Sequence, residues 1–312
     1  MGIRQSDYEN YDYRQFWEED KRLYEDGSER IAIRKFLKGE QRKNKLLVDL
    51  GCGYGRLFNE YRDFERIILV DFSIKNLQNA REIISKYPGN QKERLSHIFF
   101  VCADVTKLPF KAGCIDSVLT VRVIHHLSNP GNLFHEVQRI LKNGGLFMLE
   151  FANKRNMKNI GKYFLKKIKV SPFSGEPYQV GETILNFHPK QIKQLLKSES
   201  FQIKKELSVS NFRISFLKKY FSIGFLLFWE RVCQYLFSYL ELGPSIFLKS
   251  VLKDNKINDL EFNFDPEFKF LDILACPACK NEKLTFGRDG KILCENCGSN
   301  FSVNEGIYNF KI

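Results

Sequence analysis

The sequence predicts an α/β protein in which a doubly wound parallel sheet is followed by a small zinc-binding module. Short apolar runs alternate with helical stretches through the first half of the chain, as strand–helix–strand units do. Glycines or acidic residues follow most of these runs, which places polar groups at one edge of the sheet. Two C-x-x-C pairs near the C-terminus indicate a compact metal site.

Five apolar runs are predicted to be the buried strands of this sheet. They are continuous rather than alternating, as expected for strands that helices cover on both faces. Helices are expected between most of them, notably over residues 73–86 and 132–141, the second closed by Gly144 and Gly145. The predicted strands comprise residues 46–50, 67–70, 99–103, 118–121 and 146–151.

Further elements are expected on both sides of this core. Residues 13–38 have the pattern of a helix rich in aromatic and charged residues, another helix is expected from His188, and a late strand over 201–207. An apolar segment, residues 216–252, is expected to hold two helices separated by Gly243 and Pro244. The expected division of the chain is an N-terminal helical segment 1–44, a cofactor-binding domain 45–215, the apolar helical segment 216–253, a linker 254–267 and the zinc module 268–312.

A glycine-rich turn follows the first predicted strand, and we expect it to open a helix. Gly51, Gly53 and Gly55 allow a tight turn and let a ligand approach the backbone N–H groups. Arg56 stands where a dinucleotide-binding fingerprint has its third glycine. A bulky residue there disfavours NAD or FAD.

Two acidic residues end the second and third predicted strands. Asp71 could accept hydrogen bonds from ribose hydroxyls, as in both nicotinamide and adenosylmethionine sites. Asp104 could accept from an adenine amine, while the N–H of Val105 meets a ring nitrogen. Either acid alone could be only a helix N-cap. Together with the glycines, they predict a nucleotide site at this edge.

Five segments, taken in the order in which they follow along the chain, resemble the motifs of class I S-adenosylmethionine-dependent methyltransferases of the type 11 kind. The resemblance rests on residues 48–55, 70–73 and 103–110, and continues through 116–127 and 136–145. It implies a Rossmann-like methyltransferase sheet in which the glycine turn wraps the methionine moiety. The residues that it implies for cofactor binding are Asp49, Gly51, Cys52, Gly53, Gly55, Asp71, Phe72, Asp104, Val105 and Val121.

His125 and His126 are the candidate catalytic residues. They follow the fourth strand, where the resemblance places the sulfonium, and a histidine can accept a proton near neutral pH. Methyl transfer needs mostly proximity and alignment, so one or both could instead only shape the pocket. Similar histidine pairs occur in wobble-uridine tRNA methyltransferases and in quinone and other small-molecule methyltransferases.

Four cysteines, Cys276, Cys279, Cys294 and Cys297, form two pairs that are fourteen residues apart. This spacing fits a closed, structural four-thiolate zinc site, and redox dithiols fit poorly in so short a module. Residues 271–310 resemble the zinc-ribbon activator subunit of translation-related methyltransferases, which is normally a separate chain. The resemblance implies a zinc ribbon fused in cis, which we expect to dock on the methyltransferase domain and to cover apolar surface there.

The formal charge of +12 is compatible with nucleic acid, an anionic membrane surface or an acidic ligand. Residues 154–169 carry seven lysines or arginines and no acid, and could either track phosphates or form the exposed face of a helix. For the apolar residues 216–252, ordinary helix packing is the leading interpretation, and they could also cap the substrate pocket, pack on the ribbon or lie against a membrane. The sequence shows neither a secretory signal nor a transmembrane run, so we expect a cytoplasmic protein with reduced thiols.

The leading functional hypothesis is a methyltransferase that uses S-adenosylmethionine and acts on an O, N or C nucleophile of a small-molecule or lipophilic substrate. One alternative is a methyltransferase of tRNA, other RNA or a translation factor, with its activator fused in cis. Another is a module that binds adenosylmethionine without catalysis. A nicotinamide oxidoreductase is disfavoured by Arg56 and Asp104.

Overall fold

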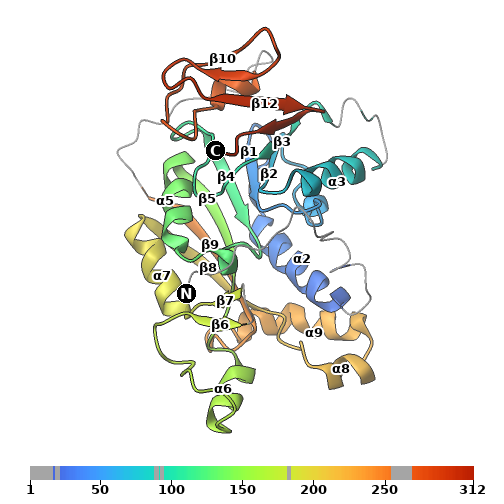
Figure 1. Cartoon of the computed structure of the whole chain (residues 1–312). Helices are drawn as coiled ribbons and strands as arrows, with labels where there is room; N and C mark the ends of the chain where they lie inside the picture. Colours follow the sequence, from blue (N-terminus) through green and yellow to red (C-terminus); the bar gives the residue numbers. More distant parts are fainter. Residues whose placement is uncertain (1–16, 18–21, 88–90, 92–94, 181–183, 254–268) are drawn as a thin grey trace.

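A large twisted sheet with helices on both faces makes up most of the molecule (Figure 1). The computed structural model describes residues 17, 22–87, 91, 95–180, 184–253 and 269–312. Across the sheet the order is β3-β2-β1-β4-β5-β9-β8. The strands of the C-terminal module continue the sheet beyond β3. The strands are β1 (Leu46–Leu50), β2 (Arg66–Asp71), β3 (Ile98–Cys102), β4 (Ile115–Thr120), β5 (Leu141–Ala152), β8 (Phe201–Val209) and β9 (Ser245–Leu252).

Strands β1 to β5 run parallel, and β9 is antiparallel to both of its neighbours, β5 and β8. The predicted doubly wound α/β sheet is therefore confirmed. Apolar side chains fill both faces, as the unbroken hydrophobic runs require. In β1, for example, Val48 packs into the core under one helical layer and Leu47 into the core under the other.

The helices form two layers, one on each face of the sheet (Figure 1). Helices α5 (Pro130–Ile140) and α7 (Pro189–Ser198) cover one face, and α2 (Leu23–Leu37) and α3 (Ile74–Ser85) cover the other. Helix α3 begins at an N-cap, Ser73, whose side chain accepts a hydrogen bond from the N–H of Asn76. The part of the expected N-terminal helix that precedes Leu23, apart from Trp17 and Arg22, lies outside the described residues.

The expected helix after the glycine turn is absent from the described structure, which is a correction to the sequence prediction. Residues 51–57 instead form a series of turns that leads into the short 3₁₀ helix η2 (Phe58–Glu60). Gly51, Gly53 and Gly55 have φ values of +74°, +56° and +76°. Right-handed helices require negative φ, so no helix runs through residues 51–55, and the residues that follow form turns and η2.

The apolar segment 216–252 also differs from its prediction. Helices α8 (Ser215–Tyr220) and α9 (Ile223–Leu236) form in its first part, but residues 245–252 form the strand β9. The position between β5 and β8 in the sheet, where a strand can pair on both sides, explains this outcome. There Ile246 and Leu248 pack into one core and Phe247 into the other, which suits a central strand. The expected linker 254–267 lies outside the described residues.

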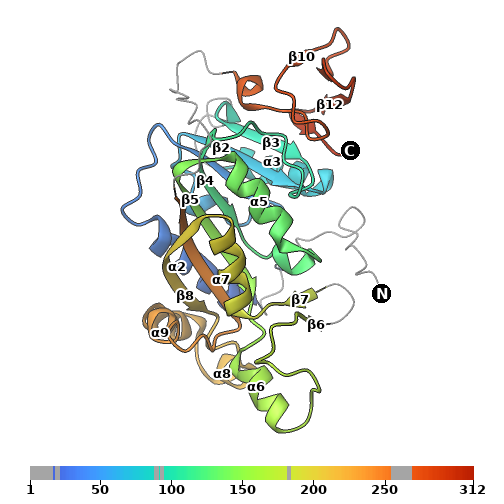
Figure 2. The ribbon, with the colours of Figure 1, turned by 90° about the vertical axis from the view of Figure 1, so that its left-hand side faces the viewer.

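Two insertions extend beyond the sheet. The first, between β5 and α7, holds helix α6 (Met157–Phe164) and the hairpin of β6 (Tyr178–Val180) and β7 (Ile184–Asn186). The second, between β8 and β9, holds α8 and α9. Both lie at the end of the molecule that is away from the C-terminal module (Figures 1 and 2).

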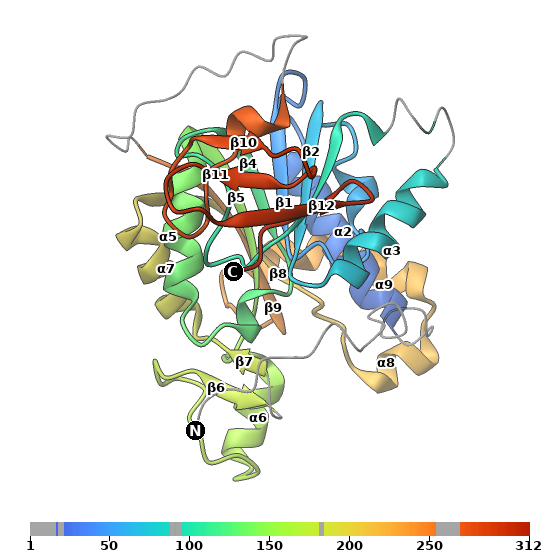
Figure 3. The ribbon, with the colours of Figure 1, turned by 45° about the horizontal axis from the view of Figure 1, so that its top comes forward.

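The C-terminal module adds its strands to the edge of the main sheet. It consists of the 3₁₀ helix η4 (Phe270–Ile273) and the strands β10 (Leu284–Phe286), β11 (Ile292–Cys294), β12 (Asn300–Asn304) and β13 (Ile307–Asn309). Strand β13 pairs in parallel with β3, with Tyr308 opposite Val101. Figure 3 shows the module lying against the upper end of the sheet.

Apolar and charged contacts hold the module in place. The ring of Phe270 stacks on Phe99, with 4.2 Å between the ring centroids. The ammonium of Lys280 lies 2.8 Å from a carboxylate oxygen of Glu136 on α5. Phe270, Ile273 and Leu274 belong to the same buried cluster as the strands and α5. The expectation that the module docks and covers apolar surface is thus confirmed.

We predict that Phe270→Ala weakens this docking and lowers the thermal unfolding midpoint of the full chain. Loss of a buried phenylalanine costs about 3–5 kcal/mol. Phe286→Ala, at a site in the same module that is 55% exposed, is the control and should leave the midpoint unchanged. Equal midpoints for the two variants, measured by calorimetry, would show that the Phe270 contact does not hold the module.

Candidate functional site

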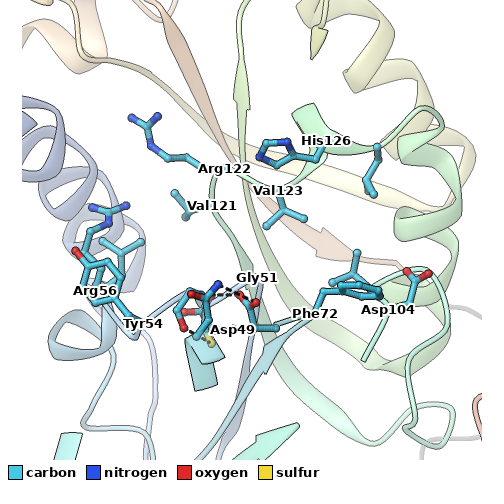
Figure 4. A pocket seen from close by; sticks show the side chains of 17 residues that line it. Asp49, Gly51, Tyr54, Arg56, Phe72, Asp104, Val121, Arg122, Val123 and His126 are labelled. Atoms are coloured by element: carbon cyan, nitrogen blue, oxygen red, sulfur yellow. Dashed lines mark hydrogen bonds between the residues drawn. The ribbon is translucent and has the colours of Figure 1, made fainter. Parts of the chain in front are cut away.

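A pocket opens at the carboxyl ends of β1, β2, β3 and β4 (Figure 4). All the predicted cofactor-contacting residues except Gly55 line it, so residues distant in sequence do meet at one place. The lining also includes residues that the sequence analysis did not assign to the site. These are Tyr54, Leu57, Asn76, Arg56, Arg122, Val123 and Leu127.

The glycine turn forms the floor of the pocket. The N–H groups of Gly51 and Cys52 both donate to the carbonyl of Val70, at 2.8 and 3.0 Å, and fix the turn to the end of β2. A Cβ at Gly51 would lie 2.2 Å from Cγ2 of Val123, so only glycine fits. Gly55 does not line the pocket, and a Cβ there would make only ordinary contact with Ala80 on α3 at 3.4 Å, so its φ of +76° is what favours glycine.

Asp71 joins the glycine turn to the start of α3. Its carboxylate accepts hydrogen bonds from the N–H of Gly53 at 2.8 Å, the N–H of Ser73 at 2.9 Å and the side-chain amide of Asn76 at 3.1 Å. Burial raises the pKa of Asp71, against the lowering effect of these donors. Two carboxylate oxygens can accept about four hydrogen bonds, so capacity remains for a ligand hydroxyl.

Asp49 is the most strongly perturbed acid of the pocket. Burial raises its pKa to about 7, although the hydroxyl of Tyr61 donates to the carboxylate and the charge of Arg56 also favours ionisation. The neighbouring charge of Asp71 acts in the same direction as burial. Asp49 can therefore carry its full negative charge only near or above neutral pH, or beside a bound cation.

Asp104 and Phe72 stand on the opposite side of the pocket from Arg56 (Figure 4). One oxygen of Asp104 accepts from both the N–H and the hydroxyl of Thr106, each at 2.8 Å, which fixes the side chain. The Phe72 ring is 42% exposed and lies 4.6 Å from the ammonium of Lys311, at the end of the C-terminal module. The module therefore reaches the rim of the pocket, which no sequence pattern indicated.

An ion cluster under α2 supports the pocket from the other side. Glu29 on α2 is fully buried, and its two oxygens lie 2.5 Å from the guanidinium groups of Arg56 and Arg122. Burial opposes ionisation of Glu29, but these two positive charges outweigh it and hold the pKa of the carboxyl below its usual range. The Trp17 ring stacks on Arg56 at 3.7 Å. Arg56, the departure from a dinucleotide fingerprint, was the only sequence signal of this cluster.

The structure separates the roles of the two candidate catalytic histidines, which lie in the 3₁₀ helix η3 (Ile124–His126). His126 lines the pocket, whereas His125 is buried beside it, with 4.0 Å between the two ring centroids. Burial holds the pKa of His125 well below its usual range, and the charges of His126 and Arg122 add to this effect. His125 is therefore neutral at neutral pH, and only His126 can meet a ligand.

The four cysteines of the two C-x-x-C pairs converge in the C-terminal module. All four Sγ atoms lie within 4.8 Å of one another, with Cys276 and Cys297 at 3.7 Å and Cys279 and Cys294 at 3.6 Å. A tetrahedral zinc with Zn–S bonds of about 2.3 Å requires sulfur atoms about 3.8 Å apart. The cluster therefore has the donor set and the spacing of a structural zinc site.

Comparison with known families agrees with this arrangement of sites. Residues 48–149 match the family described as a methyltransferase domain, and residues 267–306 match the Trm112p-like proteins. The chain therefore contains a methyltransferase domain and a Trm112p-like domain within these two ranges. The pocket belongs to the first domain, and the cysteine cluster belongs to the second.

Relatives of the chain occur in archaea, eukaryotes and bacteria. An uncharacterized protein of Methanocaldococcus jannaschii is 30% identical over 166 residues, which are 52% of this chain and 64% of that protein. An uncharacterized chloroplastic methyltransferase of Arabidopsis thaliana is 31% identical over 137 residues, 43% of this chain and 35% of that protein. Malonyl-[acyl-carrier protein] O-methyltransferase of a Methylovorus species is 29% identical over 121 residues, 36% and 39% of the two chains. The chain thus spans less than two thirds of each relative.

Two solved structures show the fold. A chain of the complex between the Haloferax volcanii Trm112 methyltransferase activator and a candidate methyltransferase aligns with a TM-score of 0.51 and 18% identity, over 77% of this chain and 96% of that one. The [4+2]-cyclase SpnF aligns with a TM-score of 0.50 and 16% identity, over 72% and 82% of the chains. A cyclase shares the fold, so function must be argued from the site.

We predict that Gly51→Ala destabilises the protein more than Gly39→Ala does. Both glycines have positive φ, +74° and +84°, so both substitutions carry a backbone penalty of about 1–2 kcal/mol. No atom lies within 4 Å of a Cβ at Gly39, whereas the stiff, β-branched Val123 blocks one at Gly51. The clash should add about 1–3 kcal/mol to the loss in the free energy of unfolding in urea. Equal losses would mean that Val123 moves aside freely.

Proposed function

We propose that the protein transfers a methyl group from S-adenosylmethionine to an O, N or C nucleophile of a small-molecule or lipophilic acceptor. The observation that carries this proposal is the convergence of the glycine turn, Asp71 and Asp104 on one pocket at the ends of three neighbouring strands. A glycine turn alone is common to many nucleotide sites. An acid at the end of the third strand as well favours an adenosine ligand without a pyrophosphate.

The polar groups of the pocket fit the parts of this cofactor. Asp71 has acceptor capacity left for ribose hydroxyls, and Asp104 is held where an adenine amine can donate to it. Phe72 offers an exposed ring face beside Asp104. At the other end, Asp49 and Arg122 supply charges of opposite sign, which suit the ammonium and carboxylate of the methionine moiety.

The acceptor is proposed to enter beside His126. When bound, S-adenosylmethionine supplies an electrophilic methyl group on a sulfonium centre. Val121 and Val123 line the same part of the pocket as His126 and can exclude water from it (Figure 4). His126 can take the proton that an O–H or N–H acceptor loses, with neutral His125 packed behind it.

We further propose that zinc binds to the four clustered cysteines. The sulfur spacings support this, and so does their place: Cys276 follows directly after residues that pair with the methyltransferase domain. The N–H of Ala275 donates to the carbonyl of Pro109, and Leu274 bridges to Phe110. The metal would thereby fix the part of the module that contacts the pocket-bearing domain.

One observation favours a second candidate function, methylation of RNA or of a translation component. The Trm112p-like domain is docked on the methyltransferase domain, and one similar structure is a complex with the Trm112 methyltransferase activator. Incorporation of labelled methyl groups into RNA, compared with lipophilic and water-soluble metabolite fractions, would decide between the two acceptors.

We predict that the protein binds one S-adenosylmethionine and that Asp104→Ala lowers its affinity. Loss of a charged hydrogen-bond acceptor costs about 1.5–3 kcal/mol, or roughly ten- to a hundredfold in affinity. Asp63→Ala, at a surface site, is the control and should bind normally. The proposal fails if calorimetry detects binding of NAD and none of S-adenosylmethionine. Binding without consumption of the cofactor, across all acceptor fractions, would indicate a module without catalysis.

We predict one zinc ion per chain, needed for folding of residues 271–310. Structural zinc contributes on the order of 10–16 kcal/mol in small modules. Cys294→Ser should lose the metal and lower the thermal midpoint, whereas Cys233→Ser on α9, outside the cluster, should keep it. The measurement is elemental analysis of protein purified under reducing conditions. A protein without stoichiometric metal would contradict the assignment.

A further inference from the structure

Both insertions emerge from the edge of the sheet that carries the cofactor pocket. Strand β5 ends at Ala152 and leads into α6, and β8 ends at Val209 and leads into α8 and α9. Because β9 is antiparallel to both, β5 and β8 point the same way, and both end at the carboxyl edge. In Figures 1 and 2, α6 and α8 lie at the same end of the molecule, away from the Trm112p-like domain.

Helix α9 has its polar side buried and its apolar side exposed. Glu230 and Gln234 are both fully buried against α2. There Glu230 accepts from the hydroxyl of Tyr24 at 2.6 Å, and Gln234 donates to the carbonyl of Ser28 at 2.9 Å. The opposite face follows the helical repeat with exposed apolar side chains: Phe225, Phe228, Trp229, Val232, Tyr235 and Leu236. A helix that faces water normally has the reverse arrangement.

Exposed apolar side chains also lie on α8 and α6, at the same end of the molecule. Phe216 and Tyr220 on α8 are more than half exposed, as are Met157, Phe164 and Leu165 on and beside α6. Single exposed hydrophobic residues are ordinary, but their number on these three helices indicates an interaction surface. We name these three helices and their flanking residues, 154–175 and 211–240, the aromatic–lysine end.

Positive charge is concentrated beside the apolar side chains of α6. Residues 154–169 hold seven lysines or arginines and no acid. The first two serve the fold, since Lys154 is buried against the carbonyl of Ser174 and Arg155 pairs with Glu241. Lys158, Lys162, Lys166, Lys167 and Lys169 form no ion pair with any acid in the described part of the chain. In residues 211–240 the one acid, Glu230, is buried, and Arg213 and Lys218 pair with Glu25 on α2.

We propose that the aromatic–lysine end binds the surface of a bilayer that contains anionic lipids. Exposed aromatic and aliphatic side chains on short helices, together with lysines, are the composition of an interfacial anchor. Two copies of the chain would bring two basic ends together, and the aliphatic Val232, Leu236 and Leu240 beside the aromatic rings favour acyl chains over nucleobases. Among the described residues no helix is long and apolar enough to cross a membrane, so contact is at the surface.

The geometry ties this surface to the acceptor. The hairpin strand β7 lies in the same insertion as α6 and contacts η3, which carries His126. A lipophilic acceptor dissolved in the bilayer would therefore meet the protein at the edge where the pocket opens. This consequence rests on the proposed methyltransferase function, whereas binding to the bilayer does not.

The test is sedimentation of the full chain with vesicles of phosphatidylglycerol and phosphatidylcholine, compared with phosphatidylcholine alone. The protein should sediment with the anionic vesicles and bind them less as salt increases. Tryptophan emission gives a second measurement, because the chain has only two tryptophans. Trp17 is 6% exposed and Trp229 is 46% exposed, so a blue shift on adding vesicles would report on α9.

Two pairs of variants separate the apolar and charged contributions. Phe225→Ser with Phe228→Ser, which keeps Trp229 as the probe, should lower vesicle affinity at least about tenfold. Lys166→Glu with Lys167→Glu should abolish the preference for anionic vesicles. The matched controls lie elsewhere: Phe286→Ser on β10 of the Trm112p-like domain, and Lys43→Glu at the amino edge of the sheet, both exposed. Neither control should change binding.

Three results would overturn the proposal: no binding to anionic vesicles, equal losses in the control variants, or a dimer in sedimentation equilibrium that Phe225→Ser with Phe228→Ser dissociates. Binding to bulk RNA without binding to vesicles would assign the surface to nucleic acid instead. Calorimetry with S-adenosylmethionine on the same preparations is independent of vesicles. It distinguishes failure of this proposal from failure of the proposed function.

Discussion

The parallel direction of the strands is the constraint on which the rest of the structure depends. Strands β1 to β5, β8 and β13 all end at the same edge, so whatever follows each strand is brought to one side of the molecule. The glycine turn, Asp71, Asp104 and His126 gather there in one pocket. The same geometry sends the two apolar and basic insertions outward from that edge. A site and a docking surface thus arise together from the connectivity of the sheet.

The pocket also depends on a buried charge. Glu29 can remain ionised without water only because Arg56 and Arg122 both contact it, one from the glycine turn and one from the end of β4. Removal of one partner of such a cluster typically costs about 3–5 kcal/mol, because it leaves a buried charge uncompensated. Arg122 adopts φ of +60°, an uncommon conformation for a residue other than glycine. Contacts of its guanidinium with Glu29 and of its N–H with Glu150 help to hold it there.

The sequence predicted the elements that local pattern determines and missed those that depend on contacts between distant residues. The five central strands, the glycine turn and the cysteine pairs are set by local pattern, and each was found. The helix expected after the glycine turn is wrong: positive φ keeps Gly51, Gly53 and Gly55 out of any helix, and the residues after them form turns and η2, which glycine spacing alone does not reveal. Residues 245–252 form a strand because a slot between β5 and β8 is open to them, which is a tertiary effect. Glu29 and Lys311 were missed because each reaches the pocket from a distant part of the chain.

Fusion of the two domains explains how Lys311 reaches the pocket. Strand β3 would otherwise be an edge with unpaired N–H and C=O groups, and β13 covers it. Since β13 runs parallel to β3, its last residues arrive at the carboxyl edge, where Phe310 donates to the carbonyl of Cys102 at 2.7 Å. The next residue, Lys311, lies over Phe72, and its charge opposes the effect of burial, which raises the pKa of Asp71, so it acts on two residues that line the pocket. A separate chain would lose translational and rotational freedom to make this contact, whereas a covalent link keeps it at high effective concentration. The cysteine cluster lies in the module, the module covers β3, and β3 ends beside the pocket, so one continuous sheet connects the cysteine cluster to the pocket.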